Sequence, residues 1–365
     1  MRKWMLLCCL CLLSVALLVP AVSMAAITTY AEFKAEMDKM GTKELVIELS
    51  GEIDMQAWTA CNYTSNYPVT IKGPSASNPA VLTNLSVPLI DRIGSFSTKV
   101  TFENIVIKDS DIVGQATDTN RASGAFVGWS YSADLTFKNC KVIDSKIGND
   151  VSETNCGWAG GIYGYMSAHN TGSVLLENCT VSGCTIRAYG SSGGLVGHVS
   201  GGVVVPVVIT NCVVEDNTIY TADPGRTDKV GDLVGTSGKS EMNIQKFTAY
   251  ENDVYAENGS EKLAVEQAIG RIGQSNGEVA ISGDCYYDGK TMDKWTLVRE
   301  NGVSQMEFDF SDSSFHVVVP GATSQGPVSH PKTGDSSNLM LWTSLMIVAA
   351  IGMVIAGKKR LSAER

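Results

Sequence analysis

Histidine is scarce in this sequence, with four in 365 residues, and none stands at short spacing from a pair of cysteines. A structural zinc site needs such a cluster of nitrogen and sulfur ligands, so a site of this type is excluded. Basic residues are also in the minority, because 28 lysines and arginines face 38 aspartates and glutamates. An acidic chain repels phosphate groups, which argues against nucleic acid and anionic lipid as partners.

A closed disulfide framework is missing as well. Three of the ten cysteines lie within residues 1–25, and the seven that follow are an odd number, so they cannot all pair. The seven are Cys61, Cys140, Cys156, Cys179, Cys184, Cys212 and Cys285.

The start of the chain has the order of a secretory signal peptide. Arg2 and Lys3 precede an uncharged apolar run over residues 4–22, and small residues follow up to Ala25. A basic start, an apolar middle and a small-residue exit are typical of such signals. An uncleaved membrane anchor is the alternative, and Pro20 argues against it. We predict cleavage after Ala25 and export of the chain.

The end of the chain combines an apolar helix with a basic stop. Residues 339–357 carry no charge and have about the length that a helix needs to cross a bilayer. Lys358, Lys359 and Arg360 follow, and such a cluster favours the cytoplasmic side. The chain before the helix is therefore expected outside the cell. A simple membrane anchor is one interpretation of this pattern.

The residues just before this helix favour a more specific interpretation. They are His330, Pro331, Lys332, Thr333 and Gly334. With the apolar helix and the basic tail, they resemble the cell-wall sorting signal of Gram-positive bacteria, in which sortases read a Leu-Pro-x-Thr-Gly motif. His330 departs from the usual Leu, which leaves the sortase class open. The resemblance implies that a sortase cysteine attacks the Thr333 carbonyl and passes the chain to an amine of peptidoglycan, after transient residence in the plasma membrane.

A repeat fills the middle of the chain. Its copies align on Asn104, Asn139, Asn178, Asn211 and, more weakly, Lys246. Around each of these anchors apolar residues alternate with polar ones, which indicates strands and excludes a helical solenoid. An aliphatic residue stands eight positions beyond every anchor, namely Ile112, Ile147, Ile186, Ile219 and Val254. A glycine motif follows, in the segments 124–128, 160–164, 193–197, 231–235 and a degenerate 270–273.

This pattern predicts an all-β fold, a single-stranded right-handed parallel β-helix of five to six coils. Coils stack about 4.8 Å apart, so like residues form columns. Cys140, Cys179 and Cys212 would then share one buried column with Ile105 and Phe247, as small apolar side chains. The asparagines would occupy a corner, hydrogen-bond along the stack and tolerate its turn geometry.

The repeats resemble the GLUG family of bacterial surface adhesins, and the segment before them is similar to pectate-lyase-like proteins. Residues 29–37 are expected to form an amphipathic helix that caps the first coil, with Tyr30, Phe33 and Met37 on one face. The predicted organisation is a signal peptide (1–25), an N-terminal cap (26–68), β-helix repeats (69–290), closing strands (291–319), a linker (320–329) and the sorting signal (330–365), which contains the transmembrane helix (339–357).

Two groups of side chains are candidates for a site. Carboxylates stand five residues beyond most anchors, where neighbouring coils would bring them about 5 Å apart, close enough for calcium or for a glycosidase pair. They are Asp109, Asp144, Asp216 and Glu251. Solvated turn residues are the simpler interpretation. A second group could form an aromatic face for sugar stacking, although alternation requires some of its members to be core. It comprises Trp129, Tyr131, Trp158, Tyr163 and Tyr165.

The sequence thus predicts a wall-anchored adhesin or ligand-binding β-helix, with a host or carbohydrate ligand. The alternatives are a surface polysaccharide lyase or glycoside hydrolase, and a structural wall protein. A single non-repeating cleft with Arg, Lys and carboxylates would favour the enzyme. A uniform flank with exposed aromatics would favour binding.

Overall fold

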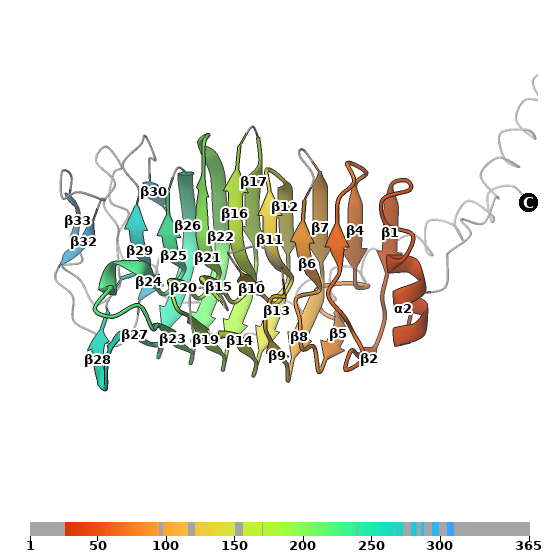
Figure 1. Cartoon of the computed structure of the whole chain (residues 1–365), viewed down its shortest axis with the longest axis horizontal. Coiled ribbons are helices and arrows are strands. Elements are labelled where there is room, and N and C mark those ends of the chain that lie inside the picture. The colour runs from red at the N-terminus through yellow and green to blue at the C-terminus, as the bar shows by residue number, and fades with distance from the viewer. Residues whose placement is uncertain are drawn as a thin grey trace, which may run out of the picture. The chain divides into compact units, whose positions relative to one another are not determined.

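Parallel strands stack in consecutive coils along most of the chain in the computed structural model (Figure 1). The structure describes residues 26–94, 98–115, 121–149, 156–169, 171–238, 240–265 and 267–272, and short strands at 279–282, 286–287, 294–298 and 305–309. Ala25, Cys285, the sorting motif 330–334 and the apolar segment 339–357 lie outside these residues. Within the described ranges, no helix has the length and apolarity that a membrane crossing requires.

A short helix covers the first coil, as the sequence predicts. Helix α2 (Tyr30–Met37) begins after Thr29, whose side-chain oxygen accepts a hydrogen bond from the Glu32 backbone N–H. Phe33 and Met37 are buried against the coil end, and Tyr30 packs beside them. The helix lies at one end of the stack (Figure 1). It thereby shields apolar core that an open first coil would expose to water.

Four sheets run along the stack. The fourteen-stranded sheet contains β1 (Leu45–Glu48), β4 (Val69–Lys72), β7 (Lys99–Glu103), β12 (Asp134–Lys138), β17 (Ser173–Glu177), β22 (Val205–Glu215), β18 (Thr180–Ser182), β13 (Lys141–Ile143), β8 (Ile105–Lys108), β5 (Ala80–Thr83) and β2 (Glu52–Asp54), with β26 (Ser240–Tyr250), β30 (Val279–Ser282) and β31 (Tyr286–Tyr287). The six-stranded sheet contains β9 (Asp111–Ile112), β14 (Lys146–Asn149), β19 (Thr185–Ala188), β23 (Thr218–Thr221), β27 (Asp253–Asn258) and β28 (Glu261–Ala264).

The other two sheets carry the glycine motifs. The four-stranded sheet contains β10 (Ala122–Gly124), β15 (Trp158–Gly160), β20 (Ser191–Gly193) and β24 (Val230–Gly231). The seven-stranded sheet contains β3 (Asn62–Tyr63), β6 (Ile90–Ile93), β11 (Val127–Tyr131), β16 (Tyr163–Ala168), β21 (Val196–Gly201), β25 (Val234–Ser237) and β29 (Ile269–Ile272). A parallel β-solenoid of about five turns is therefore confirmed.

The core consists of the columns that the repeat predicts. In the first copy, Val100, Phe102, Ile105 and Ile107 are all fully buried. The aliphatic residues eight positions beyond the anchors pair in register across the six-stranded sheet and are also buried. Cys140, Cys179 and Cys212 are free and buried, and Cys212 pairs with Phe247 in the next coil. Burial raises the pKa of the Cys184 thiol to about 12, so this thiol is neutral at physiological pH.

The asparagine corner also has the predicted geometry. All four asparagines and Lys246 have positive φ, between 51° and 56°. Asn139, Asn178 and Asn211 each donate to the side-chain amide oxygen of the preceding asparagine, with Nδ2–Oδ1 distances of 2.8, 3.1 and 2.7 Å. Asn104, the first of the series, donates to the Gly73 backbone carbonyl oxygen at 3.4 Å. Asparagine suits this corner because it tolerates left-handed backbone and carries both a donor and an acceptor.

The structure corrects the alignment of the fifth glycine motif. Gly270 pairs with the second glycine of the fourth motif, because Val234 and Thr236 are in register with Ile269 and Arg271. The sequence alignment had matched Gly270 to the first glycine, Gly231. The second position needs glycine because a Cβ at Gly270 would lie 2.1 Å from the Gly235 carbonyl oxygen of the coil beneath.

The first two coils differ from the repeats. Strands β1 and β2 already pair in parallel with β4 and β5, so the first coil begins at Leu45, inside the segment predicted as the cap. Strands β3, β5 and β6 have no counterpart in the sequence prediction, because they are short and lack the anchor motifs. At the other end, β32 (Lys294–Val298) and β33 (Gln305–Asp309) form an antiparallel pair within the predicted closing strands.

Candidate functional site

One outward column runs along the seven-stranded sheet. It consists of the residue that directly follows the second glycine of each motif, and it continues into the irregular coils at both ends. Its members pair in register from coil to coil, as Asn62, Arg92, Trp129, Tyr165, His198, Thr236 and Arg271. The inward neighbours of Trp129 are Gly128 and the buried Ser130, and those of Tyr165 are Gly164 and the buried Met166. We call this set the sheet column.

The centre of the sheet column is a cluster of aromatic rings. Trp158 of β15 stacks on Tyr165, with ring centroids 4.1 Å apart and planes 14° apart. His198 presents an edge to both rings, at 5.5 and 5.2 Å. Tyr131 meets Trp129 edge to face at 4.3 Å. Apart from Trp129, these side chains are partly exposed, so a contiguous aromatic surface reaches solvent.

The predicted aromatic face is thus divided as alternation requires. Tyr163 points inward and is fully buried, and its hydroxyl hydrogen-bonds with the Ser130 hydroxyl. Burial raises the pKa of Tyr163 well above its usual value. Trp129, Trp158 and Tyr165 point outward. Tyr163 therefore belongs to the core, Trp129 is buried beneath the Arg92 guanidinium, which lies 4.6 Å from its ring centroid, and the other members of the set reach solvent.

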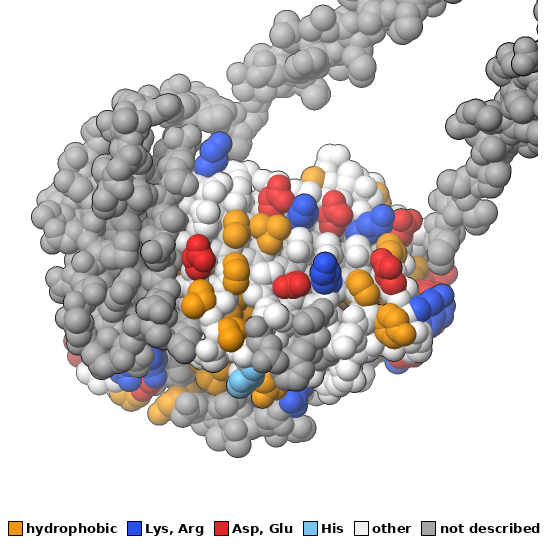
Figure 2. All heavy atoms as spheres, turned by 90° about the horizontal axis from the view of Figure 1, so that it is seen from above, with side chains coloured by type: hydrophobic (Ala, Val, Ile, Leu, Met, Phe, Trp, Pro, Cys, Tyr) orange, Lys and Arg blue, Asp and Glu red, His pale blue; other side chains and the backbone are white. Residues whose placement is uncertain are grey.

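The charge of this face differs from that of the rest of the molecule. In the described strands of the seven-stranded and four-stranded sheets, the charged residues are Asp91, Arg92 and Arg271, and Asp91 is buried. The fourteen-stranded sheet instead carries ion pairs between coils, such as Lys72 Nζ with Glu48 Oε1 at 3.0 Å. Figure 2 shows one face of the molecule where acidic and basic side chains are interspersed. An acidic protein thus has an aromatic face whose exposed charges are guanidinium groups.

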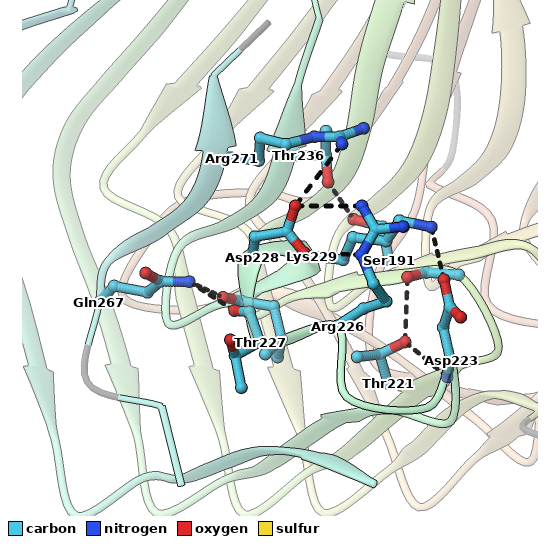
Figure 3. A network of polar contacts seen from close by, with 12 residues as sticks. Ser191, Thr221, Asp223, Arg226, Thr227, Asp228, Lys229, Thr236, Gln267 and Arg271 are labelled. Atoms are coloured by element: carbon cyan, nitrogen blue, oxygen red, sulfur yellow. Dashed lines mark hydrogen bonds and ion pairs between the residues drawn. The ribbon is translucent and has the colours of Figure 1, made fainter. Parts of the chain in front are cut away.

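A polar network lies at the far end of the sheet column (Figure 3). The loop between β23 and β24 contains a short 3₁₀ turn, η1 (Thr227–Lys229). Arg226 pairs with Asp228 through Nε–Oδ1 and Nη2–Oδ2 contacts of 2.9 and 3.1 Å. Arg271 Nη1 lies 3.5 Å from the same carboxylate. Lys229 pairs with Asp223 at 2.5 Å. The network holds one more basic than acidic group and occurs at a single position along the stack.

Burial and these charges together set the protonation states of His198 and Asp228. Burial, followed by the positive charges of Arg271 and Lys229, lowers the pKa of His198 to about 3. Its imidazole is therefore neutral at physiological pH. Burial acts to raise the pKa of Asp228, but the hydrogen bond and charge of Arg226 and the charge of Arg271 outweigh it and lower that pKa. Asp228 thus stays ionised and cannot donate a proton near neutrality.

The predicted carboxylate column lies at another corner of the coil, between the fourteen-stranded and six-stranded sheets. Its members all have positive φ, as turn residues do: Asp109 (51°), Asp144 (47°), Asp216 (53°) and Glu251 (53°). Gly183 occupies this corner in the coil after Asp144. A Cβ added at Gly183 would lie 2.3 Å from Asp144 Oδ1. Among the described residues, no group of three or more His, Cys, Asp or Glu side chains could hold a metal ion. The geometry is that of a turn.

Sequence reasoning missed the ends of the sheet column and the polar network. Selecting the residue that directly follows the second glycine of each motif would have found Thr236. The same selection, made with the corrected alignment of the fifth motif, would have found Arg271. Arg92 lies in a coil without a glycine motif, so no repeat signal marks it. The loop residues Arg226 and Asp228 belong to an insertion between the anchors, which the repeat does not describe.

Comparisons with known proteins leave the family open. No family model matches the sequence, and no curated protein matches it. Among solved structures, a crystal structure of a candidate immunoglobulin A1 protease from Bacteroides ovatus is similar, with 17% sequence identity, 80% of each chain covered and a TM-score of 0.42. A likeness of this degree does not indicate what the present chain binds.

Proposed function

We propose that this chain is an exported surface protein that binds carbohydrate along the sheet column and is attached to the cell wall by sortase. The observation that carries the binding proposal is the partly exposed, stacked pair of Trp158 and Tyr165, continued by His198. Resemblance of residues 330–334 to a sorting motif supports the attachment. Binding and attachment are tested separately.

Three features of the sheet column suit an extended carbohydrate chain. Aromatic rings offer apolar surface at low entropic cost, and the C–H faces of sugar rings pack against such surface. Coils rise about 4.8 Å apart, which is close to the length of one sugar ring in an extended chain. Polar groups continue the column on either side of the rings, with Asn62 and Arg92 in one direction and, beyond the buried Thr236, Arg271 in the other. One sugar per coil could thus contact the protein.

Removal of one ring should weaken binding by about tenfold, because a lost stacking contact is worth ~1.4 kcal/mol. The measurement is isothermal titration calorimetry of the full chain in mild detergent against cellohexaose, xylohexaose and chitohexaose. Trp158→Ala and Tyr165→Ala should each bind about tenfold more weakly than wild type to whichever of the three sugars the wild type binds.

Two controls separate ring loss from unfolding. Tyr165→Phe keeps the ring and should bind within about twofold of wild type. Tyr67→Ala removes an aromatic side chain that is 48% exposed and lies outside the seven-stranded sheet, so it should change nothing. Unchanged affinity in both alanine variants, or no binding to any of the three sugars, would disprove the binding proposal.

Attachment is tested by the linkage of the mature chain to the wall. Wild-type cells digested with muramidase should release a fragment whose C-terminus is Thr333 joined to peptidoglycan, because the sortase would cleave after that residue. Thr333→Ala should abolish this linkage. Lys332→Ala is the matched control, since this position is variable in the resembled motif, and it should keep the linkage. An unprocessed tail in the membrane fraction of wild-type cells would leave a simple membrane anchor instead.

Cleavage of the bound carbohydrate is the second candidate function. The polar network favours it, because a catalytic group occurs once along a stack whose other features repeat. Against it, both carboxylates of the network already pair with cations, and the lowered pKa of Asp228 keeps that group from acting as a general acid. Incubation of the bound hexasaccharide with the full chain, followed by chromatography, distinguishes the two functions. Shorter products that Arg226→Ala abolishes would establish the enzyme.

A further inference from the structure

A cavity lies beside the N-terminal cap. Its volume is about 430 Å³, within the range of ligand pockets. One wall is formed by α2 and the turn after it, including Lys34 and Asp38, and the other by residues 58–65, which contain β3. The proposed carbohydrate function does not itself call for this cavity.

The sheet column leads directly to this cavity. Asn62, which lines it, is the first member of the column and pairs with Arg92, the next member. Tyr63 is buried, so Asn62 beside it faces outward, and Asn62 is exposed. A chain that lies along the column therefore reaches the cavity at the first coil.

Part of the cavity wall is fixed by core packing, and another part carries polar side chains. Trp58 packs against Phe33 with ring centroids 5.3 Å apart, and its Nε1 donates to the Pro88 carbonyl oxygen at 3.3 Å. Within the described residues, the side chains of Thr59, Asn62 and Thr64 make no hydrogen bond with protein groups. An amide and two hydroxyls supply both donors and acceptors, as the hydroxyl groups of a sugar require.

The cap prevents a ligand from continuing beyond this point along the column. Strand β3 is the first strand of the seven-stranded sheet, and α2 covers the end of the stack (Figure 1). We propose that the cavity holds the terminal sugar of a carbohydrate chain whose following sugars lie along the sheet column. The protein would then recognise chain ends rather than chain interiors. This inference rests on the proposed carbohydrate function.

Chain length tests the inference. The full chain is titrated with whichever of cellohexaose, xylohexaose and chitohexaose it binds, and with a much longer soluble chain of the same sugar. End recognition gives the same affinity per chain for both lengths, so the affinity per sugar falls in proportion to length. A constant affinity per sugar would overturn the inference.

A filled cavity provides the second measurement. Asn62→Trp should lower the affinity for the hexasaccharide at least tenfold. Gln56→Trp places the same ring at an exposed cap position that does not line the cavity, and should have no effect. If Asn62→Trp binds normally while Trp158→Ala and Tyr165→Ala weaken binding, the column proposal stands and end recognition fails. If wild type binds none of the three sugars, both proposals fail.

Discussion

Phe137→Ala should destabilise the β-helix by about 3–5 kcal/mol, the usual loss when a buried phenylalanine is truncated in a core that cannot collapse. Phe137 is fully buried and stacks parallel to Phe102 of the preceding coil, with ring centroids 5.4 Å apart. Phe126 and Tyr163 lie at 5.9 and 6.3 Å on its other sides. Three aromatic rings from two successive coils thus lose their common neighbour.

The effect should also be local. Each coil of a solenoid contacts only its neighbours, so the loss is expected to spread to adjacent coils and then decay. Urea unfolding measures the free energy, and hydrogen exchange should show lost protection in β7, β12 and β17 but not in β26. Phe137→Leu keeps most of the volume and should cost about 1–2 kcal/mol. A loss below about 1 kcal/mol for Phe137→Ala would show that the surrounding rings refill the space.

Much of the coil could be predicted because its signals are local and repeated. The inward positions around each asparagine, the aliphatic position eight residues later and the buried cysteines recur at the same places in every copy. Aligning the copies is therefore enough to predict these positions as core. In the first two coils, strands β3, β5 and β6 escaped prediction, because no pattern can be read from a strand as short as the two residues of β3. The fifth glycine motif was misaligned because Gly270 is required by the close approach of the coil beneath it, which sequence spacing does not reveal.

The candidate site was only partly predictable. The sequence supplied the aromatic residues, but whether Tyr163 or Tyr165 faces solvent depends on strand register, which one residue of slip reverses. The sheet column as a whole is a property of stacking, because Arg92 and Arg271 are 179 positions apart and share only their place in the coil. The cap cavity arises where a helix meets a coil end, and no motif in either segment encodes it.

Asn178→Ala should cost about 2–3 kcal/mol, although the side chain is exposed. Alanine resists the left-handed backbone, with a penalty of ~1–2 kcal/mol, and two amide hydrogen bonds are lost at ~0.5 kcal/mol each. Asn178 donates to Asn139 and accepts from Asn211, at 3.1 and 2.7 Å. Asn178→Gly keeps the backbone geometry and should recover about half of the loss. Equal losses for Ala and Gly in urea unfolding would mean that backbone strain plays no part.

Lys246→Asn should instead raise the free energy of unfolding. Lys246 has φ 54°, which is unfavourable for lysine, and it follows Asn211 in the corner. Asparagine there would relieve the strain and donate to the free lone pairs of Asn211 Oδ1, which extends the ladder by one coil. We expect about 0.5–1.5 kcal/mol of stabilisation. Lys246→Gly, which relieves strain without adding a hydrogen bond, should gain less. If Lys246→Asn gains no more than Lys246→Gly, then the asparagines are retained for their backbone conformation, and the amide ladder contributes nothing to stability.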